Sequence, residues 1–230
     1  MRAFEDSFRN VLRGAGMDPT LLSQALNSKT RIFNAFCRLL QTKHIDAITV
    51  KEICAEANVG KSTFYAYFKD KYAIMQWYSE LAYEIGVNEI GRTCTWEEGH
   101  RLTTSAILKK QSVLHRAAQS NDYNSLGLFS PRCREKTIIE TIVRYKGIPL
   151  TEVIHCQVVA YTAGELAVTK RFFADKTEDS LDMLVDVMTS IVPKELYELL
   201  KTPSSLPADS QTLQRKQFEL FVLQSDNGLL

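Results

Sequence analysis

Apolar residues recur along this chain at intervals of three and four positions, the spacing that places side chains on one face of a helix. The stretch over 30–43 shows the pattern clearly, with an apolar face of Ile32, Phe33, Phe36, Leu39 and Leu40. The same spacing predicts helices over roughly 50–57, 61–68, 70–93, 96–120, 134–146, 151–174, 177–192 and 211–224. Because no stretch alternates with a period of two, the sequence predicts an all-α fold.

Polar residues at the start of several of these stretches strengthen the prediction. The segments Thr49–Glu52 and Thr95–Glu98 each have a threonine followed three residues later by a glutamate. This is the capping-box pattern, in which each of the two side chains bonds the other residue's backbone N–H. Asp70 and Thr151 are suitable N-caps for the helices that follow them. We expect helices to begin at these four positions, and Pro193 to end or kink the helix before it.

The stretch Asn58–Lys71, which reads NVGKSTFYAYFKDK, permits two interpretations. Its Gly-Lys-Ser triplet could end a phosphate-binding loop, which requires another glycine five positions before Gly60 and a strand in front. That position is Ala55, and the residues around it form a capped amphipathic helix. The sequence therefore argues against a nucleotide hydrolase.

The second interpretation is a helix-turn-helix. Two short helices flank the three-residue turn Asn58–Gly60, as in the motif that lays its second helix in the major groove of DNA. Phe64 and Phe68 would bury the back of that helix, while Tyr65 and Tyr67 face outward. The positive N-terminal end of the helix would then lie nearest the base edges, and its outer tyrosines and lysines suit phosphate oxygens.

The distribution of charge agrees with this interpretation. The whole chain has a net charge of only +1 at pH 7, but residues 29–71 hold eight lysines and arginines against four acids, a net charge of +4. Residues 72–230 carry a net charge of −3. A basic segment on a mildly acidic body fits a protein that touches phosphates with one end.

The segment ITVKEICAEANVGKSTFYAYFKDKYAIM resembles the N-terminal domain of the tetracycline-repressor (TetR) family. The shared features are a threonine that starts the first helix, Val-Gly near the end of the turn, the run Thr63-Phe64-Tyr65, and basic residues before the next long helix. The likeness covers roughly residues 30–75. It implies three DNA-binding helices, a long fourth helix, and a helical ligand domain that ends in two long dimerising helices.

The resemblance divides the chain into four parts. They are an N-terminal helical extension over 1–28, a helix-turn-helix DNA-binding domain over 29–71, a ligand-binding and dimerisation domain over 72–201, and a linker with a C-terminal tail over 202–230. The implied function is transcription regulation, with a repressor that binds a palindromic operator as a homodimer and is released by a small-molecule effector. The alternatives are an activator, or a helical protein-interaction module that uses the same fold without an inducer.

The resemblance also implies a set of DNA-binding residues by position. They are Thr49, Gly60, Lys61, Ser62, Thr63, Tyr65, Tyr67 and Lys71. The threonines Thr49 and Thr63 would hold phosphate oxygens, and Tyr67 and Lys71 would grip further phosphates. The others would sit at or near bases, where a lysine such as Lys61 suits O6 or N7 of guanine.

Two recognition helices about 34 Å apart, one turn of DNA, require a dimer. Helices over 151–174 and 177–192 are the candidates to form it, and the expected interface residues are Ala160, Ala163, Gly164, Ala167 and Val185. By resemblance, 72–150 should hold a ligand cavity. Its aromatic and polar candidates are Trp77, Tyr78, Trp96, His100, His115 and Tyr123.

Other chemistry is not indicated by the sequence. The five cysteines are scattered without a Cys-x-x-Cys pair, which is typical of reduced thiols in a cytoplasmic protein, and the four histidines lack metal-site spacing. The start MRAFEDSFRN lacks the apolar core of a secretory signal, and no apolar run approaches the length of a membrane helix. We therefore expect no enzyme activity, no cofactor, no metal and no membrane partner.

Overall fold

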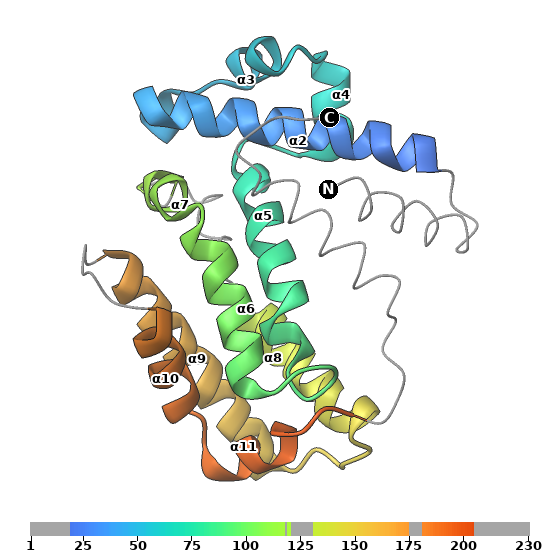
Figure 1. Ribbon diagram of the computed structural model, residues 1–230, viewed down its shortest axis with the longest axis vertical. Helices are drawn as coiled ribbons and strands as arrows, with labels where there is room; N and C mark the ends of the chain where they lie inside the picture. Colours follow the sequence, from blue (N-terminus) through green and yellow to red (C-terminus); the bar gives the residue numbers. More distant parts are fainter. Residues whose placement is uncertain (1–18, 118, 121–130, 175–180, 205–230) are drawn as a thin grey trace. The chain divides into compact units, whose positions relative to one another are not determined.

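The computed structural model describes residues 19–117, 119–120, 131–174 and 181–204 (Figure 1). Its α-helices are α2 (Pro19–Thr42), α3 (Val50–Ala57), α4 (Lys61–Tyr67), α5 (Tyr72–Ile85), α6 (Trp96–Leu108), α7 (Gln111–Ala117), α8 (Pro131–Glu140), α9 (Glu152–Ala174), α10 (Leu181–Ser190) and α11 (Lys194–Leu200). Two 3₁₀ turns, η1 (Ile45–Ala47) and η2 (Val87–Glu89), and a π-helical turn, η4 (Thr141–Tyr145), complete the set. The described residues contain no β-strand, so the all-α prediction is confirmed for this part of the chain.

The chain folds into two compact units. In the part that the structure describes, unit 1 comprises residues 19–81, 112–117 and 119–120, and unit 2 comprises 82–111, 131–174 and 181–204. Unit 1 therefore includes most of α5, all but the first residue of α7, and residues 119–120, which we had expected in the ligand domain over 72–201.

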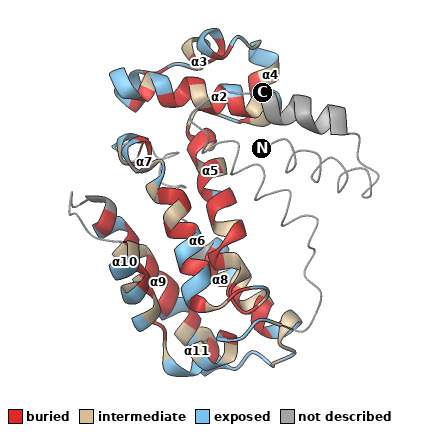
Figure 2. Ribbon diagram, viewed as in Figure 1, coloured by how far each residue is buried: buried red, intermediate tan, exposed pale blue. Residues whose placement is uncertain are grey.

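Unit 1 is built on the apolar faces that the sequence pattern predicts. Phe33, Phe36 and Leu40 on α2 are fully buried, as are Ile53 of α3 and Phe64 of α4. Buried residues accordingly line the sides on which these three helices pack together (Figure 2). This core presents α3 and α4 as a helix-turn-helix.

Unit 2 has its own core around the indole of Trp96, which is fully buried. The rest of that core comes from η2, α8, η4, α9 and α11, with Val87, Ile138, Ile142, Val158, Tyr161, Leu196 and Leu200 among its members. The Trp96 indole N–H donates to the carbonyl of Tyr197 at 3.2 Å, so the one polar atom of the ring is also satisfied.

The predicted helix starts are confirmed at all four caps. The two capping boxes at Thr49 and Thr95 have both of their reciprocal hydrogen bonds. Asp70 accepts from the amide of Ala73 at 2.9 Å, and Thr151 accepts from the amide of Ile154 at 3.2 Å. Local side-chain chemistry therefore fixes where these helices begin.

The predicted helix ends are less accurate. The helix expected over 70–93 ends at Ile85, because at Gly86 the chain turns so close to α6 that an added Cβ would lie 2.6 Å from the carbonyl oxygen of Gly99. The helix expected over 96–120 breaks into α6 and α7.

Other differences lie at the two ends of the described chain. Helix α2 begins eleven residues before the predicted start at Thr30, and α11 was not predicted. The helix expected over 211–224, like residues 1–18 of the N-terminal extension, lies outside the described residues.

Candidate nucleic-acid interface

The second helix of the pair, α4, carries its apolar side inward and its polar side outward. Phe64 is fully buried, whereas Lys61, Ser62 and Ala66 are exposed and Tyr65 has 57% of its surface accessible. The ring of Tyr65 meets the ring of Phe64 edge-on at 5.4 Å, so the buried ring supports the exposed one. The outer face of α4 is therefore polar, and the described residues of unit 1 leave it uncovered.

Gly60 caps the N-terminus of α4 without being required there by the fold. Its φ of −74° suits any residue, and an added Cβ would lie 3.6 Å from the Ser62 hydroxyl, an ordinary contact. Glycine at this position instead leaves the helix N-terminus bare, so that an outside surface can approach the backbone closely.

The turn between α3 and α4 is held by a side chain from α2. Asn58 ends α3 with a φ of 51°, in the left-handed region that asparagine tolerates. The Arg31 guanidinium donates to the Ala57 carbonyl through Nε at 3.0 Å and through Nη2 at 2.6 Å, and also to the Asn58 carbonyl. Arg31 thus satisfies carbonyls that the end of α3 leaves unpaired.

The start of α3 is fixed by its capping box. The Thr49 hydroxyl accepts from the Glu52 amide at 3.2 Å and donates to the Glu52 carboxylate at 2.8 Å. Lys43 also binds that carboxylate at 2.5 Å, and the Lys43 and Thr49 hydrogen bonds lower the pKa of Glu52 to about 2. Thr49 is exposed, so its hydroxyl could turn its proton toward a phosphate oxygen only by releasing Glu52.

Five of the eight cations in 29–71 are already engaged within unit 1. Two pair with acids and three contact backbone or rings: Arg38 with Glu56, Lys43 with Glu52, Arg31 and Lys71 with carbonyls, and Lys29 with the Trp77 ring at 4.9 Å. The remaining three, Lys51, Lys61 and Lys69, are exposed and have no hydrogen bond or ion pair within the described part of the chain. These three lysines are the charges left for an outside anion.

Lys71 does not have the geometry that we expected of it. Its Nζ donates to the carbonyls of Ile45, Asp46 and Ile48 at 2.7, 3.1 and 2.8 Å. An ammonium group has three N–H donors, and these three carbonyls use all of them. Lys71 therefore holds the turn in front of α3 and is not available to grip a phosphate.

The other expected DNA-binding residues lie near one another on unit 1. Thr63 and Tyr67 are half-buried on α4, and the Tyr67 ring lies 5.9 Å from the ammonium group of Lys29. Lys51, which our expectation omitted, and Lys69, which it placed just beyond the outer face of α4, stand out because they are exposed and unpaired within the described residues.

Residues 32–76 match the family model described as bacterial regulatory proteins, tetR family. The chain is a TetR-type DNA-binding regulator. The matched residues cover the C-terminal part of α2 from Ile32 onward, all of α3 and α4, and the first turn of α5. No curated protein matches the chain. Among the described residues, no helix has both the length and the apolar character needed to cross a membrane.

The six ligand-contact candidates of this TetR-type protein are not brought together. Trp77 and Tyr78 pack against Phe33 in unit 1, where Tyr78 is fully buried and stacked at 5.2 Å. His115 lies on α7 in the same unit, 3.3 Å from the side-chain amide of Gln119. Tyr123 lies outside the described residues.

The remaining two candidates lie in unit 2, and only one of them lines a cavity. The cavity measures ≈ 30 Å³ and is lined by Tyr83, Val87, His100, Thr103, Thr104, Ile107, Glu165, Thr169, Leu184 and Met188. Trp96 lies instead in the core. Four of the lining residues come from α9 and α10, which we had assigned to dimerisation alone. The sequence feature that could have indicated this role of α9 is the pair Glu165 and Thr169, two polar residues four positions apart in a mostly apolar helix.

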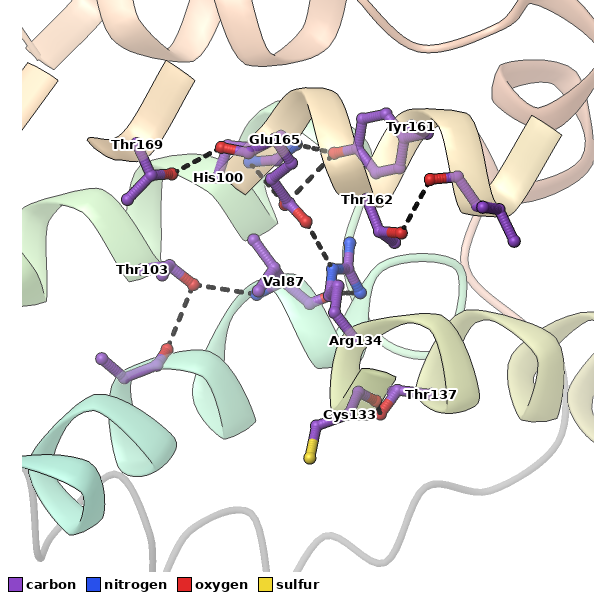
Figure 3. Close-up of polar contacts among 12 residues, drawn as sticks. Val87, His100, Thr103, Cys133, Arg134, Thr137, Tyr161, Thr162, Glu165 and Thr169 are labelled. Atoms are coloured by element: carbon purple, nitrogen blue, oxygen red, sulfur yellow. Dashed lines mark hydrogen bonds and ion pairs between the residues drawn. The ribbon is translucent and has the colours of Figure 1, made fainter. Parts of the chain in front are cut away.

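A buried polar cluster adjoins this cavity (Figure 3), and two of its members, His100 and Glu165, line it. Arg134 Nε lies 3.3 Å from a Glu165 carboxylate oxygen, and the Tyr161 hydroxyl lies 3.2 Å from the other oxygen and 2.9 Å from His100 Nε2. The Arg134 and Glu165 side chains are only 4% and 9% exposed. Burial, assisted by the charge of Arg134, lowers the pKa of His100 to about 3, so the imidazole is neutral at pH 7.

The expected dimer residues fall into three groups. Ala160, Ala163 and Ala167 are exposed on α9. Gly164 is half-buried, and a Cβ added there would lie 3.5 Å from the Ile191 side chain of the same chain. Val185 is 1% exposed within unit 2, so it belongs to the subunit's own core and the expectation that it lines a dimer interface does not fit the structure.

Within the described residues, no three histidine, cysteine, aspartate or glutamate side chains gather as a metal site requires.

Proposed function

We propose that this TetR-type protein binds an operator in double-stranded DNA as a homodimer and represses transcription in the cytoplasm until a small molecule binds unit 2. The observation that carries the proposal is the outer face of α4, where exposed Lys61, Ser62 and Tyr65 surround a bare helix N-terminus. In a helix-turn-helix this end of the second helix meets base edges. Lys51 and Lys69 flank that face in sequence and would bind phosphates.

The proposed DNA contacts also include Thr49, Thr63 and Tyr67. They no longer include Lys71. Thr49 and Thr63 would each offer a hydroxyl to a phosphate, and Gly60 would let the backbone come close. Lys71 would act indirectly, through the turn that it holds in front of Thr49.

The decisive experiment is selection of bound sequences from fragmented genomic DNA, followed by affinity measurements over a salt series. The two lysines proposed as phosphate contacts, Lys51 and Lys69, make four in a dimer, which predicts a slope of about −4 in log K against log salt. Replacing Lys69 by glutamine should reduce that slope by about 2 per dimer, whereas Lys136→Gln on exposed α8 should leave it unchanged. A chain that selects no sequence is not a DNA-reading regulator.

The proposed dimer rests on α9. Val153, Cys156, Ala160, Ala163 and Ala167 all lie exposed at helical spacing on this helix, and Val153 is 61% exposed. The opposite side of α9 packs in the core of unit 2 through Val158 and Tyr161, so the helix is apolar on both sides. A helix of this kind is stable when both sides are covered, and small residues let a second α9 approach closely.

Light scattering tests this interface. The protein should be a dimer at micromolar concentration, and Ala163→Glu should convert it to a monomer because two carboxylates would be buried together. Ala55→Glu, the same change at an exposed alanine of α3, should leave the dimer intact. A dimeric Ala163→Glu variant would show that another surface holds the subunits together.

The proposed effector site is the cavity in unit 2. Small-molecule sites usually measure about 300–1,000 Å³, so a cavity of ≈ 30 Å³ must enlarge as a ligand enters. The charges of Arg134 and Glu165 balance each other, and His100 is neutral. A neutral ligand with a hydrogen-bonding group and an apolar body therefore fits best, because a charged ligand would leave a buried charge without a partner.

A fragment screen by thermal shift tests the site. Compounds that raise the melting temperature of the wild-type protein through this cavity should have no effect on Leu184→Trp, whose larger side chain would fill it. Hits that persist in that variant bind elsewhere.

A further inference from the structure

The connection between α2 and α3 is held by residues that come much later in the chain. Arg116 on α7 donates through Nη1 to the carbonyls of Leu40 and Gln41, at 3.1 and 2.9 Å. These carbonyls belong to the last turn of α2, where the helix leaves its C=O groups unpaired. A guanidinium group at this place also complements the negative end of the helix dipole.

A second contact of the same segment reaches the turn itself. The Ser120 hydroxyl, which is buried, donates to the carboxylate of Asp46 in η1 at 2.5 Å. The Tyr72 hydroxyl donates to the same carboxylate oxygen at 3.2 Å. The Ser120 hydrogen bond is the largest influence on Asp46 and lowers its pKa, against an opposing effect of burial, with further lowering by Tyr72, His44 and Lys71.

The turn is thus held on two sides by polar groups. Lys71 holds three of its carbonyls, and Ser120 holds its one carboxylate. A surface groove of ≈ 550 Å³, lined by Asp46, Ile48, Val50, Asp70, Lys71 and Tyr72, runs beside it. On the side that faces this groove, the conformation of the turn is therefore held by directional hydrogen bonds and not by close packing.

The position of this turn matters because Thr49 follows it directly. Thr49 caps α3, and α3 is joined to α4 by the turn at Asn58. A shift of the turn would consequently move the start of α3 and with it the outer face of α4. Binding groups must be held to within about 0.5 Å by their supporting residues to act.

We propose that Arg116 and Ser120 are positioning residues for DNA reading, which together form a clamp, here called the α7 clamp, that fixes the α2–α3 connection. The clamp lies outside residues 32–76, the part of the chain that matches the DNA-binding family model. The inference rests on the proposed function, since it assigns to the clamp a role in operator binding.

The test compares operator DNA with random DNA of the same length. Ser120→Ala and Asp46→Asn should each weaken operator binding about tenfold, because the first removes the hydrogen bond between these side chains and the second removes the charge that strengthens it. Binding to random DNA should change less than about twofold, because phosphate contacts tolerate small shifts of the helices. The double variant should be no weaker than either single variant, and Ser120→Thr should restore affinity.

A matched control removes a hydroxyl that has no contact with this connection. The Ser190 hydroxyl on α10 donates to the Val187 carbonyl of its own helix in unit 2, so Ser190→Ala should bind operator DNA as the wild type does. Equal losses of Ser120→Ala on operator and random DNA would overturn the positioning role. So would additive losses in the double variant.

A second readout needs no DNA. Hydrogen exchange of the amides of Thr49–Ile53 should be faster in Ser120→Ala and in Arg116→Met than in the wild type, and unchanged in Ser190→Ala. Unchanged exchange in the clamp variants would refute the clamp even if DNA binding is found. If the wild-type protein selects no operator while exchange responds as expected, the proposed function fails and the role in DNA reading fails with it.

Discussion

The two units of this protein place their polar side chains in opposite ways. In unit 1, Lys51, Lys61 and Lys69 lie at the surface, near helix ends, and have no hydrogen bond or ion pair within the described residues. In unit 2 Arg134, Glu165, His100 and Tyr161 lie in the interior and bond one another. Exposed groups without partners are available to an outside molecule, whereas the interior groups already stabilise the unit that contains them. Removal of one of these polar side chains should therefore mainly weaken DNA binding if the side chain belongs to unit 1. It should mainly lower the unfolding free energy if the side chain belongs to unit 2.

The largest effect is expected at Glu165. Glu165→Ala leaves the Arg134 guanidinium buried without its counter-ion, which typically costs about 3–5 kcal/mol of unfolding free energy. Urea unfolding can be followed for unit 2 alone through Trp96 fluorescence in a Trp77→Phe background, since the chain has 2 tryptophans, one in each unit. The exposed pair of Arg101 and Asp182, at 2.6 Å, is the control.

Arg101→Ala should change the unfolding free energy by less than about 1 kcal/mol, as exposed ion pairs usually do. Equal costs at Glu165 and Arg101 would contradict the distinction between interior and surface polar groups.

The second effect depends on pH. The pKa of His100 is lowered from 6.5 to about 3 in the folded protein, so the unfolded chain takes up the proton first as the pH falls. The stability contributed by neutral His100 is complete above pH 6.5 and decreases by about 1.4 kcal/mol per pH unit toward pH 3. We expect the unfolding free energy of wild-type unit 2 to fall more steeply than that of His100→Gln between pH 6 and about 4. Parallel curves would show that His100 is accessible to protons in the folded state.

The third effect is on binding alone. Lys61→Ala should weaken operator binding by about 1–3 kcal/mol and relax the sequence preference. Its unfolding free energy should stay within about 0.5 kcal/mol of the wild type, because the side chain is exposed and unpaired. Lys136→Ala is the control for the loss of one surface charge. Equal losses of affinity for operator and random DNA would indicate that Lys61 contacts a phosphate and not a base.

The smallest effect compares the two capping boxes, which have the same sequence pattern in different units. Thr49→Val and Thr95→Val should each lower the unfolding free energy of their unit by about 1 kcal/mol. Only Thr49→Val should also weaken operator binding, because Thr95 lies in unit 2, away from the helix-turn-helix in sequence. Loss of operator affinity in Thr95→Val would mean that the stability of unit 2 controls DNA reading.

The parts of the molecule that the sequence predicts well are those fixed by near neighbours in the chain. The capping boxes, the turn at Asn58 and the buried side of α4 all depend on residues within a few positions of one another. The end of α5 was predicted wrongly because it depends on Gly99, which approaches Gly86 only in the folded unit.

The assignments of functional residues were likewise accurate where they depend on near neighbours in the chain. Lys61 and Tyr65 could be placed on the outer face of α4 from helical spacing alone. Lys71 could not be assigned correctly, since its three carbonyl partners lie more than twenty positions earlier in the chain. The cavity of unit 2 was missed for the most part because α6, α9 and α10 contribute to it together.

The contact of Arg116 with Gln41 joins residues 75 positions apart. During synthesis the residues of α2, α3 and α4 are made before this arginine, so the helix pair can form only without its clamp until Arg116 has been added. The entropy lost on closing such a loop grows only slowly with its length, so the long separation between Arg116 and Gln41 adds little to the free-energy cost of their contact. This separation in sequence matters for engineered chimeras. Exchanging residues 32–76 between two regulators would transfer the base-reading side chains together with the turn that the clamp holds. The clamp residues would still come from the recipient protein, so they would face a turn for which they were not matched.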